Sequence, residues 1–159
     1  MCRHINKLEL ITMATETFIT AGEQAVIFNL RDEHYGLDIF RVVEIIRLRE
    51  ITPIPKVADY VRGLVNLRGK TIPVIDLGVR FGLGTTMDSD SARIIVVDSD
   101  GGNVGVLVDG VREVIALSAD QVEGPPAVSD RVKADFIRGV AKEGGSLITL
   151  LDLDCALAG

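Results

Sequence analysis

The chain has 159 residues, a formal net charge of −6 and an apolar share of 47%, with five phenylalanines, two tyrosines and no tryptophan. Nucleic-acid binding needs a basic groove with stacking rings, and this acidic, aromatic-poor composition argues against a DNA or RNA partner. The two cysteines, Cys2 and Cys155, lie at opposite ends of the sequence and form no Cys-x-x-Cys pair, which indicates neither a zinc site nor a disulfide scaffold.

Residues 1–22 are expected to form a mobile N-terminal tail. Residues 1–13 carry positive charges but no continuous apolar core, so they do not form a signal peptide; Met13 is an alternative start. No apolar run approaches the roughly 18–20 residues that span a bilayer. We therefore expect no direct membrane insertion and a reducing, cytoplasmic compartment.

The first predicted elements form a hairpin. Apolar residues alternate along 24–30, which predicts a half-buried strand, and 34–39 returns as a second strand after a turn at 32–33. Residues 40–49 suit a helical turn as well as a strand, and their β-branched side chains favour a short turn followed by a strand. The Thr-Pro-Ile-Pro segment at 52–55 is an edge segment or a loop.

A second hairpin follows, with strands at 64–67 and 71–75. The turn between them is Arg68-Gly69, in which glycine supplies a positive φ at low steric cost. Asp76 is placed to cap a short helical turn over 77–81.

The second half of the chain follows the same plan after a polar connector at 82–90. Its predicted elements are strands at 93–98 and 103–109 around a turn at 99–102, a strand at 111–117, a long loop through 130, a hairpin within 136–153 and a C-terminal stub helix within 153–158.

The two halves match each other at fixed spacings. A shift of 76 places Arg62, Gly63, Gly69, Ile72, Asp76 and Leu77 on Arg138, Gly139, Gly145, Ile148, Asp152 and Leu153. A shift of 69 places Gly36, Val42, Glu44 and Ile46 on Gly105, Val111, Glu113 and Ile115. Ordered matches indicate an internal duplication; the alternative is two generic hairpins that share turn glycines.

These elements predict an all-β fold of two small five-stranded β-barrel subdomains that arose by internal duplication, with short helical turns and a C-terminal stub helix. We place one domain at 23–157, with subdomain 1 at about 23–84 and subdomain 2 at about 91–157.

Two near-motifs for cofactors or metals fail on their spacing. Gly63 and Gly69-Lys70-Thr71 resemble a phosphate-binding loop, but five residues separate the glycines and a strand follows. Asp98 and Asp100 suggest calcium, but the sixth and twelfth loop positions are Asn103 and Asp109. A hairpin turn explains them.

The remaining polar residues do not converge on a catalytic site. Asp152 matches the capping residue Asp76, so capping explains the Asp152–Asp154 pair. His34 has no partner histidine at metal-ligand spacing, and no Gly-x-Ser-x-Gly elbow is present. We therefore predict a binding module with no enzymatic activity, no metal and no cofactor.

Arg68 occurs in one copy only, since the matching tip of the second hairpin is Lys142-Glu143-Gly144. Features of a single copy are freer to serve function than shared ones. Arg68 is either a solvated surface charge or a forked contact to carboxylates of a partner. The echo of Glu44 at Glu113 leaves a structural role open for that glutamate.

The run Val-Arg-Gly-Leu-Val-Asn-Leu-Arg-Gly-Lys-Thr-Ile-Pro-Val-Ile-Asp-Leu at 61–77 resembles the signature of the CheW family of bacterial chemotaxis coupling proteins. The resemblance extends over about 24–157, through Tyr-Gly-Leu-Asp-Ile at 35–39 and Gly-x-x-Val-Asp-Gly-Val at 105–111. It implies two five-stranded barrels with an apolar groove between them.

The resemblance further implies a cytoplasmic adaptor that couples the tips of chemoreceptors to the regulatory domain of the histidine kinase CheA in membrane receptor arrays. Carried over by motif, the implied receptor-binding residues are Ile39, Val42, Glu44, Arg68 and Val104. The implied kinase-binding residues are Arg47, Ile51 and Arg62. On this basis Arg68→Glu is expected to weaken receptor binding with little change in the thermal midpoint.

Two alternatives remain open at this point. One is a coupling protein of a chemosensory pathway unrelated to motility. The other is a small-ligand-binding β protein that uses the cleft between the barrels, which would need polar groups converging there.

Overall fold

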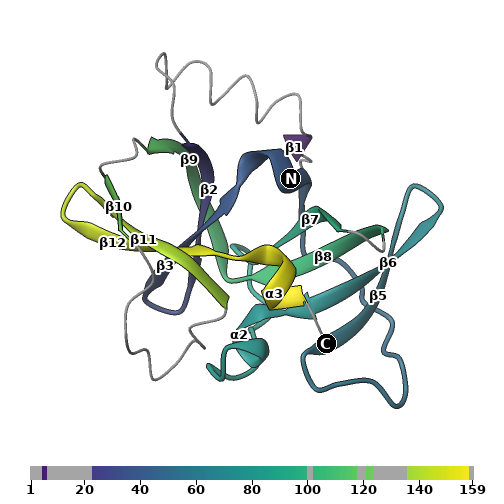
Figure 1. Ribbon diagram of the computed structural model, residues 1–159. Coiled ribbons are helices and arrows are strands. Elements are labelled where there is room, and N and C mark those ends of the chain that lie inside the picture. Colours follow the sequence, from purple (N-terminus) through teal and green to yellow (C-terminus); the bar gives the residue numbers. More distant parts are fainter. Residues whose placement is uncertain (1–4, 7–22, 100–101, 118–120, 124–135, 158–159) are drawn as a thin grey trace.

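The computed structural model describes residues 5–6, 23–99, 102–117, 121–123 and 136–157 (Figure 1). The described strands form two sheets, A and B, of six strands each. In each sheet one strand has only two residues, so two five-stranded sheets carry the fold. The predicted all-β class is confirmed.

Sheet A has the strand order β1-β4-β7-β8-β6-β5. Its strands are β1 (Ile5–Asn6), β4 (Val42–Arg47), β5 (Val61–Leu67), β6 (Lys70–Asp76), β7 (Arg93–Ser99) and β8 (Gly102–Val108). Neighbours are antiparallel except β6 and β8, which are parallel.

Sheet B has the order β10-β11-β12-β3-β2-β9. Its strands are β2 (Glu23–Leu30), β3 (Glu33–Asp38), β9 (Gly110–Leu117), β10 (Val122–Glu123), β11 (Ile137–Glu143) and β12 (Ser146–Leu151). Here β12 and β3 form the parallel pair.

The strand registers support the internal duplication. The parallel pair of sheet A matches Val74 with Gly105, and that of sheet B matches Leu150 with Gly36. Leu150 is Val74 shifted by 76, and Gly36 is Gly105 shifted back by 69. The two sheets therefore use equivalent positions of the two copies.

The sheets do not follow the predicted division into 23–84 and 91–157. The β2-β3 hairpin of the first copy lies in sheet B, and the β7-β8 hairpin of the second copy lies in sheet A. The β2-β3 and β7-β8 hairpins are equivalent, so either one could pair with β6 or with β12. The alternation of apolar residues is the same in both hairpins and cannot distinguish these pairings. The chain crosses between the sheets after Asp38 and at Asp109.

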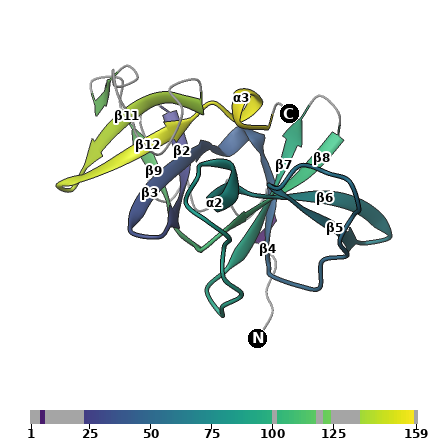
Figure 2. The same ribbon diagram turned by 90° about the horizontal axis from the view of Figure 1, so that it is seen from below.

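Among the described residues, three apolar clusters make up the interior. One lies inside each sheet, and the equivalent residues Ile46, Val65, Ile72, Val74, Ile94 and Val96 of sheet A recur as Ile115, Ala141, Ile148, Leu150, Ala25 and Ile27 of sheet B. The third cluster, the shared core, takes side chains from both sheets and from the helices. Figure 2 shows α2 and α3 between the two groups of strands.

The segment that follows β4 reaches β5 at the opposite edge of sheet A. After β4, Thr52 exchanges two backbone hydrogen bonds of 2.8 Å with Leu64 of β5. The following Pro53 and Pro55 have no amide hydrogen to extend this pairing, and 52–55 is otherwise a loop as predicted. Gly63 has φ +146, and a Cβ there would collide with the carbonyl oxygen of Thr52, so glycine is required at this contact.

The helical elements are short and capped. Between β3 and β4, η1 (Ile39–Arg41) confirms the predicted turn, and Asp38 accepts a hydrogen bond from Phe40 N. After β6, α2 (Leu77–Arg80) is capped by Asp76, whose Oδ1 accepts from Gly78 N at 2.9 Å. The C-terminal α3 (Leu153–Leu157) confirms the predicted stub helix.

The predicted mobile tail lies outside the described residues except for β1, which pairs with β4. The proposed calcium position Asp100 and most of the long loop before residue 136 are also outside them. Among the described helices, none is both long and apolar enough to cross a membrane.

Candidate functional site

Glu44 and Arg68 form a forked ion pair. Glu44 lies on β4 two residues from Ile46, so its side chain faces the interior of sheet A and is only 3% exposed. The guanidinium of Arg68 donates from two nitrogens to the two carboxylate oxygens, at 2.8 and 3.0 Å. Its side chain remains 63% exposed. The arginine thus covers a buried carboxylate and presents its other face to solvent.

The hairpin turn brings Arg68 over Glu44. Both Arg68 and Gly69 have positive φ, of 53° and 82°, and Asn66 Oδ1 accepts a hydrogen bond from Gly69 N. This confirms the predicted turn glycine. The sequence allowed two roles for Arg68, a solvated surface charge or a contact to a partner. In the structure Arg68 pairs with Glu44 of the same chain, and the outer face of its guanidinium stays accessible.

The apolar receptor-binding residues lie deeper than expected. Ile39 and Val42 are 1% and 0% exposed and belong to the shared core, and Val104 is half-buried against it. The side chains of the protein itself therefore fill the seam between the sheets at Ile39 and Val42, where the resemblance implied an open groove. The accessible apolar side chain nearby in sequence is Phe40, which is 65% exposed.

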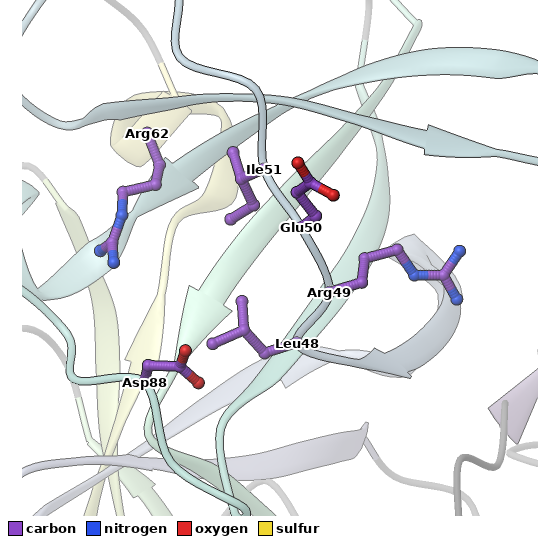
Figure 3. A pocket seen from close by; sticks show the side chains of 6 residues that line it. All are labelled: Leu48, Arg49, Glu50, Ile51, Arg62 and Asp88. Carbon is purple, nitrogen blue, oxygen red and sulfur yellow. The ribbon is translucent and has the colours of Figure 1, made fainter.

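A second group of the named residues surrounds a cleft of about 350 Å³ on sheet A. Its lining residues are Leu48, Arg49, Glu50, Ile51, Arg62 and Asp88. Figure 3 shows Leu48 and Ile51 in the middle, with Arg62 and Asp88 on one side and Arg49 and Glu50 on the other. The lining combines two apolar side chains with charges of both signs, a mixture that suits a protein–protein surface. The structure thus brings Ile51 and Arg62 together, whereas Arg47 is not among the lining residues.

Arg62 is held in place by a buried acid. Its Nη1 lies 2.9 Å from Asp76 Oδ2 and 3.3 Å from the carbonyl oxygen of Thr86. Asp76 is 1% exposed and also accepts from Thr86 N at 2.9 Å and Thr86 Oγ1 at 2.6 Å. This network satisfies the buried carboxylate. Sequence reasoning found the capping role of Asp76 but missed the Thr86 contacts, which span ten residues.

Within the described part of the chain, two other polar contacts are an ion pair and a helix cap. Arg41 lies 2.8 Å from Asp154, and its hydrogen bond and positive charge hold the pKa of that carboxyl below the usual value. Asp152 accepts from Cys155 N at 3.2 Å, which confirms the predicted cap. Within the described ranges, no three His, Cys, Asp or Glu side chains are grouped to hold a metal ion.

Comparison with known proteins shows similarity to the CheW-like proteins. A sequence model of the CheW-like domain matches residues 24–158. A "Chemotaxis protein CheW" of Treponema pallidum is 36% identical over 134 residues, which are 82% of this chain and 79% of the relative. A protein of the same name from Klebsiella aerogenes is 32% identical, over 87% and 84% of the two chains. The crystal structure of the scaffolding protein TtCheW from Thermoanaerobacter tengcongensis is 40% identical, with a TM-score of 0.81 over 87% of this chain and 94% of that one.

Proposed function

Because the chain belongs to the CheW family of chemotaxis proteins, we propose that it is a non-enzymatic adaptor that couples chemoreceptors to the histidine kinase CheA. The single observation that carries the proposal is the family match over residues 24–158, which spans both sheets. The adaptor would work in the cytoplasm, held at receptor arrays by its protein partners.

We assign receptor binding to the surface around Arg68. A receptor tip is a helical hairpin, and helices dock through apolar anchors with charges that fix their register. The exposed face of the Arg68 guanidinium can bind a carboxylate of the partner while its other face stays on Glu44. Ile39 and Val42 would then act by supporting this region from the core rather than by direct contact.

We assign kinase binding to the cleft formed by Leu48, Arg49, Glu50, Ile51, Arg62 and Asp88. Ile51 is half-buried and supplies apolar surface, while Arg62 is fixed by Asp76 and needs no ordering on binding. Preorganised side chains lose less conformational entropy when a partner docks. Arg47 lies at the end of β4, close in sequence to this cleft.

The test measures both partners separately by calorimetry, using a purified CheA regulatory domain and a receptor cytoplasmic fragment. Arg68→Ala is expected to weaken receptor binding with kinase binding unchanged, and the exposed cleft variant Glu50→Arg to do the reverse. Arg112→Ala, an exposed arginine on sheet B, is the matched control. Wild-type protein that binds neither partner would overturn the proposal, and equal losses for both partners in both variants would overturn the two assignments.

A further inference from the structure

Arg31 has an unusual backbone and an unusual number of partners. It lies in the turn between β2 and β3 with φ 57°, a left-handed conformation that residues other than glycine rarely adopt. Its Nη1 donates to both oxygens of Asp109, at 3.0 and 2.9 Å. Its backbone N also donates to Asp109. A strained backbone of this kind persists only where the surroundings hold it.

The other end of the Arg31 guanidinium holds the connector that follows α2. Nη2 donates to three successive carbonyl oxygens, Leu83 at 3.3 Å, Gly84 at 2.8 Å and Thr85 at 2.9 Å. Asp109 is where the chain crosses from sheet A to sheet B. One side chain therefore fixes residues 83–85 against the junction of the two sheets.

Residues 83–85 lead directly into the cleft. The next residue, Thr86, donates to Asp76, and its carbonyl oxygen accepts from Arg62. Two residues further on, Asp88 lines the cleft together with Leu48 and Ile51 (Figure 3). The wall of the cleft that carries Asp88 is thus fixed at two consecutive points, by Arg31 and then by Asp76.

Comparison of the two duplicated copies shows that the contacts of Arg31 are not a shared feature of both. Under the shift of 69, the position of Arg31 corresponds to Asp100, so the second copy has no arginine there. The arginine is therefore a feature of one copy and not of the duplicated sequence pattern. The fold does not demand an arginine in this turn, and a local task for Arg31 remains.

We propose that Arg31 is a positioning residue for the cleft, which sets its affinity for a protein partner by holding residues 83–85 without touching that partner. The inference rests on the proposed function of the cleft as the kinase-binding surface. Without the clamp, residues 83–88 sample more conformations, and binding must order them again. The Thr86 carbonyl oxygen, which accepts a hydrogen bond from Arg62, is then also held less firmly.

The sharpest variant is Arg31→Gly, because glycine accepts the positive φ and removes the side chain with little backbone strain. We expect the affinity for the CheA regulatory domain to fall about fivefold, in the range of couplings carried by such networks, with receptor-fragment binding unchanged. Arg31→Lys keeps a charge for Asp109 but has a single nitrogen, so it is expected to lose affinity as well. Arg41→Ala, which removes another clamp on Asp98 and Asp154, is the matched control.

A second measurement reports the clamp itself. Amide hydrogen exchange at Thr86 should accelerate in Arg31→Gly and stay unchanged in Arg41→Ala, because only the first releases residues 83–85. If wild-type protein does not bind the kinase domain, the proposed function and this inference fall together. If wild type binds and Arg31→Gly binds equally well, or Thr86 exchange does not change, the positioning role alone is refuted.

Discussion

Removing Arg68 should destabilise the protein although the arginine is mostly exposed. Arg68→Ala leaves the carboxylate of Glu44, 3% exposed, without its two guanidinium hydrogen bonds. Breaking a fully buried ion pair costs about 3–5 kcal/mol, whereas an exposed pair is worth less than about 1 kcal/mol. Since one partner is buried and the other is 63% exposed, we expect a loss of about 2 kcal/mol in the free energy of unfolding.

A loss of that size lowers the thermal midpoint by about 4–8 °C for a chain of this length. This differs from the expectation drawn from the sequence, in which an exposed turn arginine leaves the midpoint nearly unchanged. Arg68→Glu should lower it further, because it places a second carboxylate against Glu44.

Urea unfolding of a double-mutant cycle isolates the pair. Glu44→Gln removes the charge and keeps the side-chain size, so Arg68→Ala should cost much less in that background, with a coupling of about 1–2 kcal/mol. A change below about 0.5 kcal/mol for Arg68→Ala in the wild-type background would refute the reasoning. It would mean that water already solvates the Glu44 carboxylate.

Two further predictions follow from burial and charge. Ile39→Ala should lower the free energy of unfolding in urea by about 2–4 kcal/mol, because it opens a cavity in the shared core; unchanged stability with lost receptor binding would instead place Ile39 on an open surface. The pKa of Asp154 should rise toward its ordinary value in Arg41→Ala, as followed by carboxyl NMR titration. Because Arg41 lowers that pKa in the folded protein, the stabilising effect of the pair is present above the unfolded-state value and is lost as pH falls through the folded-state value; a titration identical in both proteins would contradict this.

Local patterns were enough to find most of the strands. Alternating apolar residues predicted β2 and β3, and the turn glycines predicted the hairpin of β5 and β6. The shift of the first turn to Arg31-Asp32 was not predictable from pattern, because arginine seldom accepts φ > 0. Its stability there depends on partners 52 to 78 residues away.

The pairing of strands far apart in the sequence could not be predicted from the sequence. The duplication was visible, but equivalent hairpins can pair with either copy, and only the three-dimensional path after Asp38 and at Asp109 decides between them. The burial of Ile39 and Val42 follows from that same crossing, because both residues lie where the chain passes between the sheets.

The sequence contains a signal for the ion pair of the candidate site. Glu44 lies two residues before Ile46 on a strand, so the alternation placed a carboxylate on the buried face. A buried acid requires a cationic or hydrogen-bonding partner. Arg68 could have been sought on that ground, although 24 residues separate the two.

The second copy of the fold serves as an internal control for this pair. Glu113 occupies the position of Glu44 under the shift of 69, yet it is exposed on β9. The hairpin tip that would cover it has Gly144 where the first copy has Arg68, so no guanidinium is available there. The same glutamate position is therefore buried with the arginine and exposed without it. Among the described residues, the forked ion pair therefore accompanies glutamate burial in sheet A, and the equivalent position in sheet B has neither the arginine nor the burial.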